Sequence, residues 1–152
     1  MVNGGIDMTT KLKTLAQAIQ TKLQSVNNGA SPTPVNYFDH VWIGMPKKIP
    51  MGDKCVAMVQ VANQPNYYYT TCAAQTTYDV DFIINIMCKG HVENATLYAY
   101  EVVEAVQTAL FNDQKISNSC LGSTIEEVDY GDYWEENKAL VTGARLTLRC
   151  RL

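Results

Sequence analysis

The sequence contains few of the residues that usually carry enzyme chemistry. Only two histidines occur, His40 and His91, and neither stands in a metal-ligand spacing such as HExxH. The motifs GxxxxGK[ST], GxGxxG and GxSxG are also missing. His40 follows Asp39, but no nucleophile accompanies the pair, so we interpret it as a polar strand end. We therefore expect a protein that is not an enzyme and needs no cofactor or metal.

The cysteines give no sign of a disulfide framework or a zinc site. Five occur, which is an odd number, and no two form a CxxC pair. We predict that they are reduced and structural, in a reducing compartment. The amino-terminal MVNGGIDM lacks the basic and apolar segments of a signal peptide, and no apolar stretch approaches the roughly 20 residues of a membrane span. The formal charge of −3 gives no general attraction to nucleic acid.

The most regular pattern runs over residues 77–111. Its first half, TTYDVDFIINIMCKG, alternates with the period of a strand. Asp79, Asp81 and Asn85 fall on one face of this strand, and the apolar face comprises Tyr78, Val80, Phe82, Ile84, Ile86 and Cys88. The second half has a period near 3.6 and predicts a helix with Asn94 as its N-cap. The apolar stripe of this helix comprises Ala95, Ala99, Val102, Val106, Ala109 and Leu110.

The remaining segments complete an α+β chain. Apolar residues at three- and four-residue steps predict a first helix over residues 7–28, which Asn27-Asn28-Gly29 ends. Strands are expected at residues 37–43 (an edge strand), 54–61 and 67–72. Residues 124–133 and 139–152 form a terminal antiparallel pair joined through Trp134-Glu135-Glu136-Asn137. We predict one α+β domain over residues 1–152, an antiparallel β-sheet with the two helices packed on one face.

The strand that starts at Tyr78 is expected to be central, with the second helix across it. Its run Phe82-Ile83-Ile84 is nearly continuously apolar, which suits a strand covered on both faces. The sheet face away from the helices would be available to a partner. Several tyrosines could add exposed aromatic surface, although buried cross-strand pairing is the preferred interpretation for most of them: Tyr67, Tyr68, Tyr69, Tyr130 and Tyr133.

Charged residues gather on the last two predicted strands. The acidic group comprises Glu126, Glu127, Asp129, Asp132, Glu135 and Glu136. Such carboxylates can bind a divalent metal or do acid–base work, but the run lacks EF-hand spacing and is better interpreted as solvated. On the last strand, Arg145, Arg149 and Arg151 share one face, opposite an apolar face. These arginines pair either with the acidic strand of the same chain or with another subunit.

Three stretches and the order of elements carry a family resemblance. The stretches are WIGMPKKIPMGDKCVAMVQV, the segment YEVVEAVQTALF after Asn94, and the closing YGDYWEENKALVTGARLTLRCR. Together they resemble the tail terminator (tail-completion) proteins of long-tailed bacteriophages, over most of the chain. The resemblance implies an α+β fold and a homo-hexameric ring. Such a ring caps the head-proximal end of the tail tube, stops tube growth and meets a neck or head-completion protein.

The resemblance also implies where the charged residues act. A virion protein of the tail or neck, assembled in the host cytoplasm and without membrane contact, has no catalytic residues to carry over. We expect Arg145, Arg149 and Arg151 to hold subunit to subunit or ring to tail tube protein. We expect Glu126, Glu127, Asp129 and Asp132 to face the channel or open solvent, where carboxylates let DNA pass without specific binding.

Other functions fit the same sequence. One is a different neck or head-closure component of a phage. A second is a small-ligand or peptide-binding domain in which the aromatic residues line a pocket. A third is an enzyme that uses the acidic cluster. The oligomeric state distinguishes them, because a ring predicts a hexamer and a binding module predicts a monomer or dimer.

Overall fold

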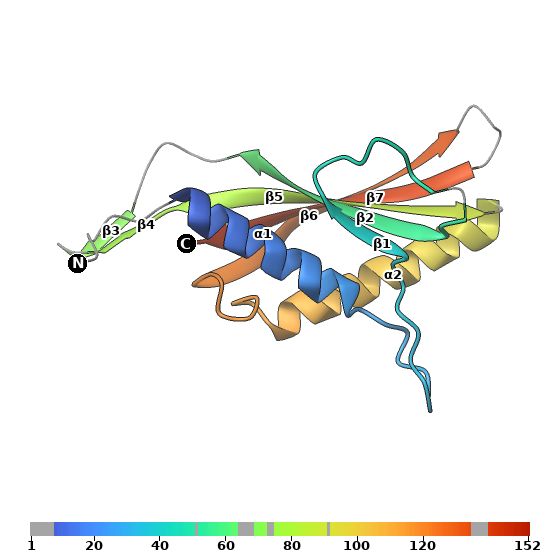
Figure 1. Cartoon of the computed structure of the whole chain (residues 1–152), viewed down its shortest axis with the longest axis horizontal. Helices are drawn as coiled ribbons and strands as arrows, with labels where there is room; N and C mark the ends of the chain where they lie inside the picture. The colour runs from blue at the N-terminus through green and yellow to red at the C-terminus, as the bar shows by residue number, and fades with distance from the viewer. Residues whose placement is uncertain (1–7, 51, 64–68, 73–74, 91, 135–139) are drawn as a thin grey trace.

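A computed structural model describes residues 8–50, 52–63, 69–72, 75–90, 92–134 and 140–152 of the chain. These residues form two helices and seven strands, shown in Figure 1. In chain order they are α1 (Met8–Gln24), β1 (His40–Ile43), β2 (Cys55–Asn63), β3 (Tyr69–Cys72), β4 (Gln75–Thr77), β5 (Asp79–Gly90), α2 (Val92–Asn112), β6 (Gly122–Trp134) and β7 (Leu140–Arg151). Neither helix is long and apolar enough to cross a membrane.

A five-stranded sheet in the order β1-β2-β5-β7-β6 organises the molecule. Both helices lie on one face of it (Figure 1), and the α+β prediction is confirmed. All neighbours are antiparallel except β1 and β2, which run parallel. Parallel neighbours need a crossover connection. Here the connection from β1 to β2 lies on the sheet face opposite the helices (Figure 1).

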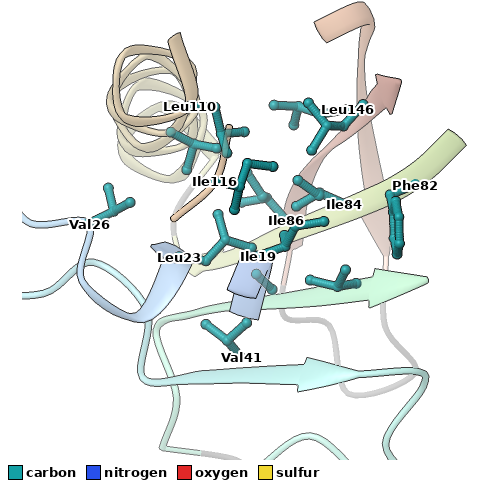
Figure 2. Packing of buried hydrophobic residues seen from close by; sticks show 14 of the residues in the cluster. Ile19, Leu23, Val26, Val41, Phe82, Ile84, Ile86, Leu110, Ile116 and Leu146 are labelled. Atoms are coloured by element: carbon teal, nitrogen blue, oxygen red, sulfur yellow. The ribbon is translucent and has the colours of Figure 1, made fainter. Parts of the chain in front are cut away.

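The hydrophobic core fills the space between the helices and the sheet. Figure 2 shows Ile19 and Leu23 of α1 and Leu110 of α2 directed toward Phe82, Ile84 and Ile86 of β5. Burying a large apolar side chain contributes roughly 1.5–3 kcal/mol. The predicted apolar stripe of α2 is confirmed, with Ala109 partly buried and the following members fully buried: Ala95, Ala99, Val102, Val106 and Leu110.

Strand β5 is central, as predicted, but it is not covered on both faces. Phe82 and Ile84 face the helices and are fully buried. Ile83, Asn85 and Met87 point to the other face and are partly exposed. The apolar run is misleading here because a strand alternates its side chains, so Ile83 shares a face with Asp81 and Asn85.

The helix ends differ from the predicted ones. Helix α2 begins at Val92, so Asn94 is its third residue and not its N-cap. Helix α1 ends at Gln24 and not at Asn28. The reason for the early end of α1 is a competing pairing, because the backbone of Val26 and Asn28 bonds to that of Tyr37 and Val35. Those carbonyl and amide groups are therefore unavailable to a continuing helix.

Strands β3 and β4 form a separate two-stranded sheet, which we call the arm. The arm lies beyond the start of β5 and outside the main sheet (Figure 1). The expected strand over residues 67–72 is therefore shorter and lies outside the main sheet. Several sequence-based assignments fall outside the described residues: Asp7, Tyr67, Tyr68, His91, Glu135, Glu136 and Asn137.

Candidate functional site on the open face of the sheet

The sheet face opposite the helices, here called the open face, carries most of the predicted site residues. The register of β5 and β7 sets Asp79 opposite Arg151, Asp81 opposite Arg149 and Asn85 opposite Arg145. Because both strands alternate with a period of two, these pairs form one ladder along the open face. The ladder is the clearest polar construction in the described part of the chain.

Two rungs of the ladder are bidentate ion pairs. Arg149 donates from Nε to Asp81 Oδ1 at 2.9 Å and from Nη2 to Oδ2 at 3.4 Å. Arg151 donates to Asp79 in the same way, at 2.9 and 3.3 Å. Paired N–H donors match the two oxygens of a carboxylate, so this geometry also fixes the orientation of the guanidinium groups.

The two partners of each ion pair differ in exposure. Asp79 and Asp81 are only 6% and 9% exposed, whereas the side chains of Arg149 and Arg151 are 48% and 52% exposed. The guanidinium groups therefore lie over the carboxylates and present their outer edges to solvent. Hydrogen bonding to Asp81 raises the pKa of Arg149 above its ordinary value, so this arginine stays charged at any working pH.

Arg145 has a weaker set of partners. Its Nε donates to Asn85 Oδ1 at 3.4 Å, and Asp129 of β6 lies opposite it in the register. Among the described residues, no carboxylate lies within 4.0 Å of its nitrogens. Its charge is therefore less compensated within the chain than that of Arg149.

The acidic residues of β6 contribute little to the ladder. Glu126 lies 3.8 Å from Arg149, at a bulge where β6 shifts its register between Ile125 and Glu127. Glu127 and Asp129 are exposed, and Asp132 lies further along the same strand. The predicted intrachain partner of the arginines was therefore mostly wrong, since the close pairs go to β5.

The sequence contains a pattern that predicts the aspartate partners of Arg149 and Arg151. Asp79 and Asp81 stand two residues apart on β5, with the spacing of Arg149 and Arg151 on β7. A matching period of opposite charges on two strands indicates cross-strand pairing. The match becomes a pairing because β5 and β7 are neighbours in the sheet, an order that no single segment determines.

A hollow in the open face lies next to Arg145. Its apolar side includes Met45, Met58 and Met87, and its polar side is lined by Gln60, Asn85, Asp129 and Arg145. Met45 comes from the connection between β1 and β2 and is largely exposed. Methionines adapt to irregular surfaces, so the apolar side of the hollow suits an apolar side chain of a partner.

His40 and Asp39 contact the last residues of the connection between β1 and β2. The His40 ring stacks on Trp42 with 5.3 Å between ring centroids, and its Nδ1 contacts the carboxylate of Asp53. Asp39 accepts hydrogen bonds from the backbone N–H groups of Lys54 and Cys55, at 2.6 and 3.2 Å. These contacts fasten the end of the connection, where β2 begins, to the start of β1. In the described ranges, no three His, Cys, Asp or Glu side chains are grouped as metal ligands.

Four of the cysteines form two neighbouring pairs inside the protein. Cys55 lies opposite Cys88 in the register of β2 and β5, and Cys120 interacts with Cys150. All four are buried and free. The hydrogen bond with Cys88 and burial raise the pKa of the Cys55 thiol, so it stays protonated and is a poor nucleophile.

Protein-family models and curated proteins gave no match to the sequence.

Proposed function

We propose that the protein is a structural virion protein of the tail terminator type. In this proposal it forms a homo-hexameric ring at the head-proximal end of a phage tail tube. The ring ends tube growth and presents its other side to a neck or head-completion protein. The proposal rests on the sequence resemblance and on one structural observation. The open face is a broad, charge-patterned surface that the chain's own helices leave uncovered.

The charges of the open face suit protein contacts. Arg145 has its charge available for a carboxylate of a neighbouring subunit or of the tail tube protein. Arg149 uses part of its five N–H donors on Asp81, and its side chain is 48% exposed, so it can also meet a partner. Arginine is favoured at interfaces because its planar group makes several directional bonds.

The acidic residues of β6 fit a role next to DNA. Glu127 and Asp129 are exposed and have no close cation among the described residues. In a ring channel, such carboxylates repel phosphate and let the duplex pass without binding. We assign the same role to Glu126 and Asp132, which lie on the same strand.

Native mass spectrometry and sedimentation of the purified protein test the ring. We expect a hexamer, or an oligomer that grows toward a hexamer as concentration rises. Arg145→Glu reverses the least compensated charge and is expected to shift the population toward monomer. The matched control is Lys13→Glu, which makes the same reversal of charge at an exposed position of α1. A protein that stays monomeric at every concentration, with and without tail tubes, contradicts the proposal.

A peptide-binding domain is the second candidate, because the hollow beside Arg145 combines methionines with a cation. This function predicts a monomer or dimer that binds acidic peptides with an apolar residue. Loss of peptide binding in Arg145→Ala, without any change in native mass, would favour it over the ring.

A further inference from the structure

Strand β6 is an open edge of the main sheet. It runs from Gly122 to Trp134, pairs with β7 on one side and has no partner on its other side among the described residues. At roughly 3.3 Å per residue its 13 residues span about 40 Å. An edge of this length offers a row of backbone N–H and C=O groups to an incoming strand.

An exposed apolar strip runs beside this edge. Helix α2 contributes Leu97, Tyr100 and Phe111, which recur at helical spacing on one side, with exposed fractions from 48% to 73%. Tyr130 of β6 meets Tyr100 with 5.1 Å between ring centroids. Between these elements, Phe111 and Gln107 line a groove together with Ile125 of β6. Side chains of a strand added to β6 would therefore lie on apolar surface at every second position.

The charge of β6 argues against a second β6 as the added strand. Glu126, Glu127 and Asp129 are exposed on this strand. Antiparallel pairing of two β6 strands would bring these carboxylates of both copies together, and like charges directly opposite are destabilising. The open edge therefore favours an uncharged strand.

The arm supplies such a strand. No charged residue occurs between Lys54 and Asp79, and the arm sequence is rich in threonine, which favours strands. Among the described residues, its two strands pair with each other and with no further strand. A two-stranded ribbon is marginally stable by itself, so the arm needs a further partner.

The arm cannot reach the open edge of its own chain. Strand β4 leads directly into β5, and β7 lies between β5 and β6. The unpaired side of β6 therefore faces away from β7 and from β5, to which the arm is joined. The arm and the β6 edge can therefore meet only between different copies.

We propose that the arm of one copy adds to the β6 edge of the next copy and extends its sheet. This contact is heterologous, so repeating it around an axis can close a ring. The inference rests on the proposed ring for its closure, although the contact itself requires only two copies.

Mixed cross-linking tests the contact. One copy keeps Cys72 of the arm, and the second carries Cys72→Ser with either Thr124→Cys or Asp129→Cys on β6. A short bifunctional maleimide is expected to give a covalent pair only in the mixture. Ile43→Cys in the Cys72→Ser background is the matched control, because Ile43 is exposed on the other edge strand, β1. Cross-links at position 43 and none on β6 would overturn the proposal.

Substitution of the arm gives a second, independent result. Thr76 lies opposite Thr70 in the arm. Thr76→Pro removes a backbone donor and is expected to abolish the oligomer signal in native mass spectra, whereas Thr76→Val keeps it. Circular dichroism controls for folding. If both variants assemble like wild type and no β6 cross-link forms, the arm contact is wrong while a measured hexamer still supports the ring. Cross-links without any hexamer would support the arm contact and contradict the ring.

Discussion

The two faces of strand β5 have different chemistry, although their residues alternate along one strand. On the helix side, Val80, Phe82 and Ile84 are fully buried in the core. On the open face, Asp79 and Asp81 lie under arginines and Ile83 is partly exposed. The comparison shows that one face supplies the packing that folds the chain, and the other holds an ordered charge pattern.

Typical free-energy contributions also differ between the two faces of β5. A buried core side chain contributes roughly 1.5–3 kcal/mol, and truncating it leaves a cavity that adds to the loss. Ion pairs with about half of one partner in solvent are typically worth about 0–1 kcal/mol. The ladder therefore adds little to the free energy of unfolding. Its bidentate geometry fixes where the positive charges lie, which is what a binding surface needs.

The largest predicted effect compares adjacent residues on the two faces. Phe82→Ala is expected to lower the free energy of unfolding by about 3–5 kcal/mol, because it empties a fully buried site. Ile83→Ala is expected to cost less than about 1.5 kcal/mol, because its side chain reaches solvent on the open face. Urea unfolding followed by circular dichroism measures both. Equal losses would show that the open face is packed as tightly as the core.

The next largest effect on stability is expected in the loop between α2 and β6. Ile116 is fully buried (Figure 2) although its φ of 45° lies in the left-handed region that β-branched residues avoid. Packing must outweigh that strain, so Ile116→Ala is expected to cost about 2–4 kcal/mol. Ser117 has a φ of 55° and is exposed, so Ser117→Gly is expected to be neutral or to stabilise by up to about 1 kcal/mol. A stable Ile116→Ala protein would mean that the strain offsets the packing.

A charge reversal on the open face is expected to separate folding from assembly. Arg149→Glu leaves Asp81 without its partner and adds a carboxylate near Glu126, so we expect a stability loss of about 1–2 kcal/mol. We also expect loss of the oligomer, and a weaker wild-type oligomer at high salt. Sedimentation with circular dichroism measures the two effects. A folded Arg149→Glu protein that assembles normally would remove this arginine from the interface.

The smallest predicted effect is a pH dependence on the helix side. Asp113, just after α2, lies 3.0 Å from Lys22 of α1. The hydrogen bond from Lys22 has the largest effect and lowers the pKa of Asp113 below its ordinary value. The hydrogen bond from the Ser117 N–H lowers this pKa further. Its contribution is therefore fully present above about pH 4 and is lost as pH falls through the lowered pKa. Wild type should lose more stability than Asp113→Asn between neutral pH and pH 3 in urea unfolding. Parallel pH curves would show that the pair contributes nothing.

Local patterns predicted the helix-side face well and the open face less well. The period-two run of Phe82, Ile84 and Ile86 and the apolar stripe of α2 follow directly from the sequence, because each depends on one segment. The aspartate partners of Arg149 and Arg151 depend on strand order, which places β7 between β5 and β6. The early end of α1 depends on pairing with Val35 and Tyr37, another contact between separate segments.

Electron microscopy of growing tail tubes tests the central proposal most directly. Tubes assembled from the tube protein of the same virus would be compared with and without this protein. We predict that the added protein forms a ring on one end of each tube and that capped tubes stop lengthening, whereas Arg149→Glu leaves the ends bare. Tubes that keep growing with bare ends, in the presence of folded wild-type protein, would contradict the proposal.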